Sequence, residues 1–301
     1  MKIIVAGASG YIGGTLVNRL IKNGERPVCL ARNITALREK FPENTVDFIA
    51  GDTLQPQTLD VALQGADVLV HAAFMTANLK QNGANRYFDV NVRGTQNLIE
   101  AAQRQGVSRI IAVSGLGTKE DKQGTYMQGR YLAEQAIQQS GLGWAILQPS
   151  IVFGPHSAFI AGLAKLVQQV PFVTPMAGSG KETFQPIWVE DVAACLDILI
   201  HDASRDDKRY PVGGPEIISY SQILDIIMAS LHKKKLKVPA PSFLMKPAAG
   251  MLEILLPNPP ITSAALELFA FPNTTELNSV QHEFGFTPQS LRQYTQEHGV
   301  W

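Results

Sequence analysis

Residues 3–13 read IIVAGASGYIG, and this stretch decides the fold. Its first four residues form a short continuous apolar run, which is typical of a strand buried on both faces. The next seven have the spacing G-x-x-G-x-x-G and lead into apolar residues at helical spacing, Ile12, Leu16 and Leu20. Between a strand and a helix, such glycines let the backbone approach a pyrophosphate at the helix N-terminus. The alternative is a plain glycine turn.

Apolar strand segments alternate with helical segments as far as residue 147. The expected strands are 3–6, 28–30, 46–50, 68–70, 110–113 and 144–147, and the main helical stretches are 12–21, 59–63, 91–105 and 126–139. This alternation predicts an α/β fold, a doubly wound parallel sheet of the Rossmann type with helices on both faces. After Pro149 the rhythm changes, with short segments between prolines. We therefore expect a Rossmann domain over 1–150 and a smaller, discontinuous substrate lobe over 151–301, with parts such as 184–213 returning to the sheet.

Composition excludes several classes of protein. The chain has 301 residues, 26 Lys+Arg against 26 Asp+Glu, and 45% apolar residues, so it is neither disordered nor basic enough to suggest nucleic-acid binding. No apolar run reaches the roughly 18 residues of a membrane span. Cys29 and Cys195 are too few for a disulfide framework or a metal cluster, and glycines interrupt the apolar N-terminus. We expect a cytoplasmic protein without a metal, in which the run Lys233 to Lys235 is a solvated helix end.

The residues after the second strand bear on the choice of cofactor. An NAD site usually has an acidic residue about 20 positions beyond the glycines, where it binds the ribose 2′-hydroxyl. Here Ala31-Arg32-Asn33 follows the strand, without a carboxylate. Arg32 is suited to pair with a 2′-phosphate, so NADP is favoured over NAD. An ordinary surface arginine is the alternative.

The order of motifs along the chain resembles the extended, atypical branch of the short-chain dehydrogenases/reductases. That branch is similar to the epimerase/dehydratase-like proteins and includes the Rossmann-type accessory subunit of respiratory complex I. The motifs are the glycine turn, Gly51-Asp52, His71-Ala72-Ala73, Asn91-Val92-x-Gly94-Thr95, Val113-Ser114, Tyr126-x-x-x-Arg130, Gln148-Pro149-Ser150, Glu190-Asp191 and Gly213-Gly214-Pro215.

The resemblance implies roles for individual residues. The cofactor-binding set it implies is Gly7, Ser9, Gly10, Tyr11, Ile12 and Gly13 in the turn, Arg32, Asp52 and Thr53 toward the adenosine, Ala72 and Ala73 on the cofactor floor, and Arg130. Tyr126 would be the proton donor beside the nicotinamide, with Arg130 as its catalytic partner. His71 is expected to be structural.

Two departures from the family pattern bear on the chemistry. Arg130 stands where the family usually has lysine, and Leu116 stands where a catalytic serine or threonine is usual, with Thr118 as a substitute if the loop bends. Arginine keeps the charge and the donors that hold a ribose, but it does not readily give up a proton. The alternative for Tyr126 and Arg130 is two polar residues on an exposed helix face.

Two functions remain open at this stage. The favoured one is an NAD(P)-dependent oxidoreductase or epimerase-type enzyme with a modified Tyr-x-x-x-Arg site and a small-molecule substrate. Its substrate pocket is expected to be walled by residues 153–159 and 184–188. The alternative is a non-catalytic NADP(H)-binding sensor or assembly subunit. A protein partner or a homo-oligomer fits either function.

Overall fold

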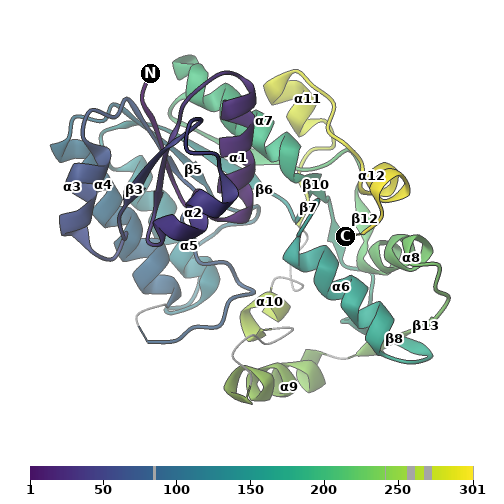
Figure 1. Ribbon diagram of the computed structural model, residues 1–301. Coiled ribbons are helices and arrows are strands. Elements are labelled where there is room, and N and C mark those ends of the chain that lie inside the picture. Colours follow the sequence, from purple (N-terminus) through teal and green to yellow (C-terminus); the bar gives the residue numbers. More distant parts are fainter. Residues whose placement is uncertain (84–85, 241, 256–261, 268–272, 301) are drawn as a thin grey trace. The chain divides into compact units, whose positions relative to one another are not determined.

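The computed structural model describes residues 1–83, 86–240, 242–255, 262–267 and 273–300 (Figure 1). The chain divides into two compact units, which are described separately. The first unit comprises residues 1–75, 81–148 and 192–210, and the second comprises 76–80, 149–191 and 211–301.

A seven-stranded sheet forms the centre of the first unit. Its strands are β1 (Ile3–Ala6), β2 (Val28–Ala31), β3 (Asp47–Ala50), β4 (Val68–His71), β5 (Arg109–Val113), β6 (Gly143–Pro149) and β11 (Lys208–Val212). Their order is β11-β6-β5-β4-β1-β2-β3, and the pairs from β3 to β6 are parallel. The predicted doubly wound Rossmann-type fold is therefore confirmed.

Helices cover both faces of this sheet (Figure 1). They are α1 (Tyr11–Lys22), α2 (Ile34–Lys40), α3 (Leu59–Leu63) after the short turn η1 (Pro56–Thr58), α4 (Gly94–Arg104), α5 (Tyr126–Gln138) and α7 (Val189–His201), with the turn η3 (Ala203–Arg205) after it. Both faces of the strands are buried because helices cover both. This explains why apolar and polar residues do not alternate along β1 and β4.

Cys29 and Cys195 are buried and form no disulfide, as predicted.

The helix predicted over 91–105 begins differently. Its first part is a π-helical segment, η2 (Phe88–Arg93), and α4 follows it. The side-chain amide of Asn91 accepts the Met75 N–H (2.7 Å) and donates to the Met75 carbonyl (3.0 Å). This pair of bonds ties the widened turn to the chain that follows β4. Periodicity alone does not reveal such a tertiary contact.

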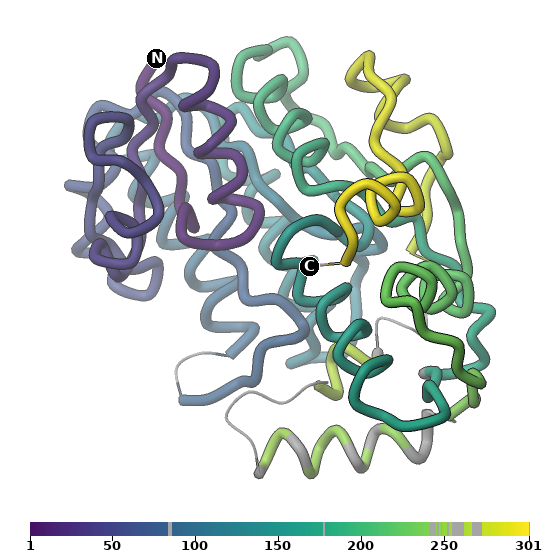
Figure 2. The backbone as a smooth tube through the Cα atoms, turned by 45° about the vertical axis from the view of Figure 1, so that its right-hand side comes forward, coloured from purple at the N-terminus to yellow at the C-terminus, as the bar shows by residue number. Residues whose placement is uncertain are grey.

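A cluster of polar side chains joins α1 to α7, which lie side by side (Figure 2). Arg19 Nε and Asn23 Nδ2 donate to one Asp197 oxygen (2.8 and 2.9 Å). His201 Nδ1 lies 2.8 Å from the Asp197 carbonyl, and its Nε2 lies 3.2 Å from a Glu25 oxygen. Burial opposes protonation of His201, but these acceptors outweigh it and raise its pKa. Glu25, Asp197 and His201 are close enough to share a metal, but Arg19 already supplies a positive charge there, and we describe the cluster as an ion-pair network.

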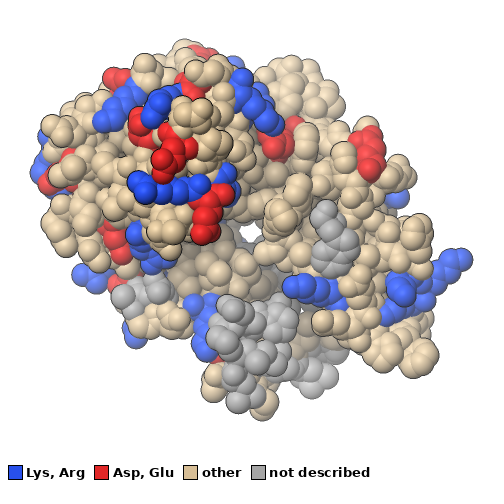
Figure 3. Space-filling view, viewed as in Figure 1, with Lys and Arg blue, Asp and Glu red and all other residues tan. Residues whose placement is uncertain are grey.

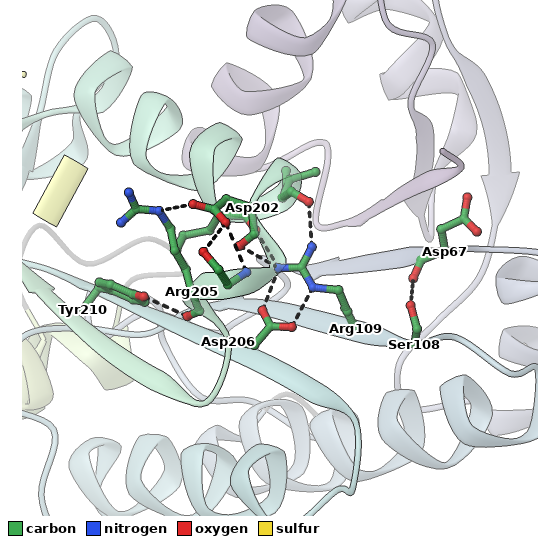
Figure 4. A network of polar contacts seen from close by, with 10 residues as sticks. Asp67, Ser108, Arg109, Asp202, Arg205, Asp206 and Tyr210 are labelled. Carbon is green, nitrogen blue, oxygen red and sulfur yellow. Dashed lines mark hydrogen bonds and ion pairs between the residues drawn. The ribbon is translucent and has the colours of Figure 1, made fainter. Parts of the chain in front are cut away.

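Arg109, on β5, anchors the end of α7 (Figure 4). Its guanidinium forms two hydrogen bonds with Asp206 (2.7 and 2.6 Å). It also donates to the carbonyls of Ile200 (2.7 Å) and Leu199 (2.8 Å), which the helix end leaves without helical partners. The side chains of Arg109 and Asp206 are only 12% and 14% exposed, so each depends on the other for compensation of its charge.

The second unit is built from short strand pairs and helices. Its strands are β7 (Val152–Phe153), β8 (Val173–Ala177), β9 (Thr183–Phe184), β10 (Ile187–Trp188), β12 (Ile218–Ser219) and β13 (Leu236–Ala240), paired as β10-β7, β12-β9 and β13-β8. Its helices are α6 (Ala158–Gln169), α8 (Tyr220–Ser230), α9 (Ser242–Leu255), α10 (Ser263–Glu267), α11 (Ser279–Phe284) and α12 (Leu291–His298). Ser219 and Gln222 form a capping box at α8. No described helix is both long enough and apolar enough to cross a bilayer.

Replacement of Arg109 by methionine should destabilise the first unit. It leaves the Asp206 carboxylate buried without a cation, and removal of one partner of a buried pair typically costs about 3–5 kcal/mol. Urea unfolding followed by circular dichroism measures the change. Arg104→Met, which breaks an exposed pair with Asp60, should cost about 1 kcal/mol or less. Equal destabilisation by the two variants would contradict the anchoring role.

Candidate functional site

The glycine turn after β1 rests directly on the end of β4. Gly7 has φ +90°, and a Cβ atom there would lie 2.6 Å from the carbonyl carbon of Ala72 and 2.7 Å from the Ala73 nitrogen. A Cβ atom at Gly13 would collide with the Gly7 carbonyl. Both positions therefore require glycine. Ala72 and Ala73, predicted as the cofactor floor, lie beneath the turn.

The N-terminus of α1 is open to an anion. Gly10 is the N-cap residue, and no side chain caps the helix there. Ser9 and Gly10 are exposed, while Tyr11 and Ile12 begin the first helical turn. The backbone at Gly10 is unstrained, because its φ of −72° suits any residue. A Cβ there would lie 3.1 Å from the Gly7 carbonyl oxygen and would extend from the helix start. The turn fits a dinucleotide pyrophosphate.

The residues expected near the adenosine lie at the ends of β2 and β3. Arg32 is exposed, directly before the Asn33 N-cap of α2, and makes no ion pair with the other described residues. Asp52 is already engaged in its loop, where its carboxylate accepts the Leu54 N–H (2.9 Å). The Thr53 carbonyl accepts the Asn97 side-chain amide (2.7 Å). Of these residues, Arg32 has the side chain most available to a ligand.

Lys40, which the sequence analysis did not single out, also reaches the glycine turn. It is the last residue of α2, and its ammonium lies 3.2 Å from the Gly10 carbonyl oxygen and 3.4 Å from that of Ser9. Partial burial lowers its pKa. Its ammonium also lies 5.5 Å from the ring centre of Phe41, and it forms no ion pair within the described part of the chain. The turn thus has a cation beside it whose charge no carboxylate balances.

Tyr126 and Arg130 form a buried pair on α5. They are 8% and 7% exposed, so the alternative of an exposed polar helix face is wrong. Arg130 Nε donates to the Tyr126 hydroxyl oxygen, and Nη1 donates to Ser114 Oγ (3.3 Å). The guanidinium also lies 5.8 Å from the ring centre of Phe74. A Cβ at Gly115 would lie 2.9 Å from Arg130 Nη1, so this glycine makes room for the guanidinium.

Glu134, one turn beyond Arg130, organises the polar groups behind the pair. It is 2% exposed and accepts hydrogen bonds from the Ser114 hydroxyl and from Gln148 Nε2 (2.9 and 3.1 Å). Arg209, on β11, supplies the positive charge, with Nε 3.0 Å from Glu134. Arg209 is not identifiable from the sequence pattern, because it lies far along the chain from Glu134.

The loop after β5 bends back so that Thr118 lies beside Ser114. Thr118 Oγ1 lies 3.3 Å from Ser114 Oγ and donates to the Gly115 carbonyl (2.7 Å). Arg130 therefore contacts the hydroxyls of both Tyr126 and Ser114, and Thr118 adjoins the latter. Three hydroxyl groups gather around one guanidinium, although Leu116 carries none.

His71 is a structural residue in this arrangement. It is fully buried, its Nε2 lies 2.8 Å from Thr95 Oγ1, and its ring stacks on Phe74 at 4.1 Å. Burial lowers its pKa to about 3. His71 is therefore neutral at physiological pH and does not serve as an acid. This agrees with the prediction from the sequence.

Comparison with known proteins agrees with this geometry. Residues 7–156 match a family model described as NAD(P)H-binding. The chain is 29% identical over 194 residues to the ceramide reductase of Caulobacter vibrioides, covering 64% of this chain and 59% of that protein. It is 25% identical to the 2-alkyl-3-oxoalkanoate reductase of Stenotrophomonas maltophilia, covering 96% and 95%. It is 23% identical to the 40 kDa subunit of NADH-ubiquinone oxidoreductase from Neurospora crassa, covering 82% and 65%. The chain thus spans less than two thirds of the length of the ceramide reductase and of the 40 kDa subunit.

Solved structures share the fold. A nucleoside-diphosphate-sugar epimerase from Staphylococcus aureus superposes with a TM-score of 0.78 at 18% identity, covering 98% of this chain and all of that one. The triphenylmethane reductase of Citrobacter sp., in complex with NADP(H), gives a TM-score of 0.76 at 18% identity and 99% coverage of both chains.

Substitution of Gly10 by valine should abolish dinucleotide binding and leave the protein folded. The backbone angle permits valine, but the side chain occupies the space above the uncapped helix start. Fluorescence titration with NADPH, alongside circular dichroism, measures both properties. Gly162→Val is the matched control, since a Cβ on that helical glycine meets nothing within 4 Å. Near-normal binding by folded Gly10→Val would mean that the pyrophosphate binds elsewhere.

Proposed function

We propose that the chain, whose residues 7–156 match the NAD(P)H-binding family model, is an NADP(H)-dependent oxidoreductase of the extended short-chain dehydrogenase/reductase type. Its substrate is a carbonyl compound, and its first unit binds the cofactor. The observation that carries the proposal is the buried Tyr126–Arg130 pair, with its hydroxyl neighbours and its buried carboxylate support. The second unit is the substrate lobe. The cytoplasmic location remains a prediction.

The proposed reaction is reduction of a carbonyl group. When bound, the reduced cofactor would supply the hydride. Tyr126 donates its hydroxyl proton to the substrate oxygen. In the contact with Arg130, the phenol oxygen of Tyr126 is the acceptor. The hydroxyl proton of Tyr126 is not used in this contact, so it stays available for transfer to the substrate. A relative with nearly full coverage is named as a reductase of a 3-oxoalkanoate, which supports a ketone on an alkyl chain as the substrate class.

Arg130 acts as a clamp in this proposal. Its guanidinium keeps a permanent positive charge and five donors, enough to hold Tyr126, Ser114 and a ribose hydroxyl together. Glu134 orients Ser114, and through it the guanidinium. Because arginine does not readily release a proton, the proton that Tyr126 donates is replaced from water. In this proposal the hydroxyl of Thr118, near Ser114, takes the place of the one missing at Leu116, and it releases the Gly115 carbonyl to donate its one proton to the substrate carbonyl.

The proposed preference for NADP rests on two cations beside the turn. Arg32 is exposed at the end of β2 and would pair with the 2′-phosphate. Lys40 adjoins the glycine turn itself and would contact the pyrophosphate, which NAD and NADP share. The two cations therefore have separable effects.

Arg32→Ala should weaken NADPH binding about 10- to 100-fold, since one charge-assisted pair is lost, and should leave NADH binding unchanged. Lys40→Met should weaken both cofactors by similar factors. Calorimetric titration of each protein with both cofactors measures these effects. The control is Arg38→Ala. Arg38 is exposed, lies on α2 as Lys40 does, and pairs with Glu43, so its replacement should change neither affinity. Equal affinity of the unmodified protein for NADPH and NADH would reject the NADP assignment.

Tyr126→Phe should reduce turnover by about 10²–10⁴, the usual contribution of a positioned proton donor, and leave NADPH affinity nearly unchanged. Arg130→Met should weaken NADPH binding, whereas Arg130→Lys should retain it. The assay follows NADPH oxidation with 2-alkyl-3-oxoalkanoates, aldehydes and quinones as acceptors. Tyr131→Phe, at the next position of α5, is the matched control and should retain the rate.

The same assay decides between the enzyme and a cofactor-binding sensor or assembly subunit. Tight NADPH binding without oxidation of any acceptor, and without any gain in Arg130→Lys, would favour the non-catalytic function. A turnover that Tyr126→Phe leaves intact would retain the enzyme and reject Tyr126 as its proton donor.

A further inference from the structure

The two-stranded sheet of β8 and β13 in the second unit, called here the β8–β13 ribbon, exposes apolar side chains of β13 and partly buries the lysines between them. Successive side chains of a strand point to opposite faces. Leu236 and Val238 are 70% and 40% exposed, whereas the lysines that alternate with them, Lys235 and Lys237, are partly buried and bonded to the protein. A surface strand normally has the opposite arrangement, with apolar residues inside and lysines in water.

The inverted register is held by specific contacts. The Lys235 ammonium donates to the Val167 and Val170 carbonyls at the end of α6, the latter at 2.6 Å. The Lys237 ammonium binds Asp225 (2.6 and 2.7 Å) and Ser221 Oγ (2.6 Å) on α8. The expectation that the whole lysine run is solvated is therefore wrong for Lys235. A shift by one residue would bury the apolar pair but break every one of these bonds.

The turn before β8 adds an aromatic residue to the same end of the ribbon. Phe172 is 87% exposed and has a φ of +62°, an uncommon conformation for a bulky residue. A hydrogen bond from the Val173 N–H to the Pro171 carbonyl (2.7 Å) closes the turn around it, and the Leu236 N–H lies 3.3 Å from the Phe172 carbonyl oxygen. The backbones of Phe172 and Leu236 are thus neighbours, and both side chains are exposed to water.

The charge around these apolar side chains is positive. Lys233 and Lys234, just before β13, are exposed and have no carboxylate partner recorded among the described residues. Residues 170–177 and 231–240 contain no Asp or Glu. On the face shown in Figure 3, blue side chains project at the lower right, in the region of β13, without red ones among them.

We propose that the Phe172–Leu236 tip of the β8–β13 ribbon, with Lys233 and Lys234, docks the protein on the surface of an anionic phospholipid membrane. Phe172 and Leu236 insert below the headgroups, and the two lysines contact lipid phosphates. A projecting aromatic residue suits a soft bilayer, and paired lysines suit a negative surface. The surface is peripheral and needs no membrane-spanning helix. It does not depend on the proposed catalytic activity.

The test is co-sedimentation of the full chain with vesicles of phosphatidylcholine alone and of phosphatidylcholine mixed with phosphatidylglycerol. Binding is expected only to the anionic vesicles and should weaken as salt rises. Lys234→Glu should lower the affinity about 5-fold or more, whereas Lys181→Glu, in the turn at the other end of β8, is the control. Phe172→Asn removes the aromatic ring but suits a positive φ, and it should also weaken binding. Leu277→Asn, at another exposed leucine, should not.

Several outcomes would overturn the proposal. One is an unmodified protein that does not sediment with anionic vesicles at low salt. Another is Phe172→Asn binding as well as the unmodified protein while its thermal unfolding is unchanged. A dimer in solution that Phe172→Asn converts to a monomer, with no vesicle binding, would assign the tip to contact between two copies of the chain instead.

Discussion

The contact between the glycine turn and the end of β4 is the constraint on which the first unit depends. The Gly7 backbone rests on Ala72 and Ala73, and the Gly13 backbone rests on Gly7, with no space for a Cβ atom at either glycine. Any side chain there would lift the start of α1 away from the sheet. Because α1 sets the direction of the uncapped helix N-terminus, this backbone contact aims the partial positive charge that attracts a pyrophosphate.

A second constraint, a buried carboxylate, supports the polar centre on α5. Glu134 accepts hydrogen bonds from Ser114 and Gln148 and forms an ion pair with Arg209, and these partners come from three different strands or their ends. A buried carboxylate requires such partners. The sheet must therefore be assembled as far as β11 before Ser114, and with it Arg130, is held in its place. In this way the fold of distant segments determines the geometry of a local i, i+4 pair.

Features formed by residues close together in the sequence could be predicted from it, whereas features formed by contacts between distant residues could not. The strands, the glycine turn and the Tyr126–Arg130 pair are local patterns, readable from runs and helical spacing. The sequence did not point to three residues of the site, because their roles depend on contacts made across the fold. They are Lys40, Gly115 and Arg209. The strand β13 was not predicted from the sequence, which indicated only a helix end at Lys233 to Lys235, and the face of this strand that turns outward depends on acceptors on α6 and α8. The π-helical start of the helix after β4 depends likewise on a tertiary amide contact.

The position of β11 at the edge of the sheet has a consequence for synthesis on the ribosome. Its neighbour β6 ends at residue 149, but β11 ends only at residue 212, with the strands β7 to β10 and the helices α6 and α7 between them. At about 5–20 residues per second, β6 emerges several seconds before the strand that covers its edge. During that interval its apolar edge, Ala145 to Leu147, has no strand beside it on that side and resembles a template for intermolecular pairing. A nascent chain of this topology is thus most exposed to aggregation, and most in need of a chaperone, while residues 150–207 are being translated.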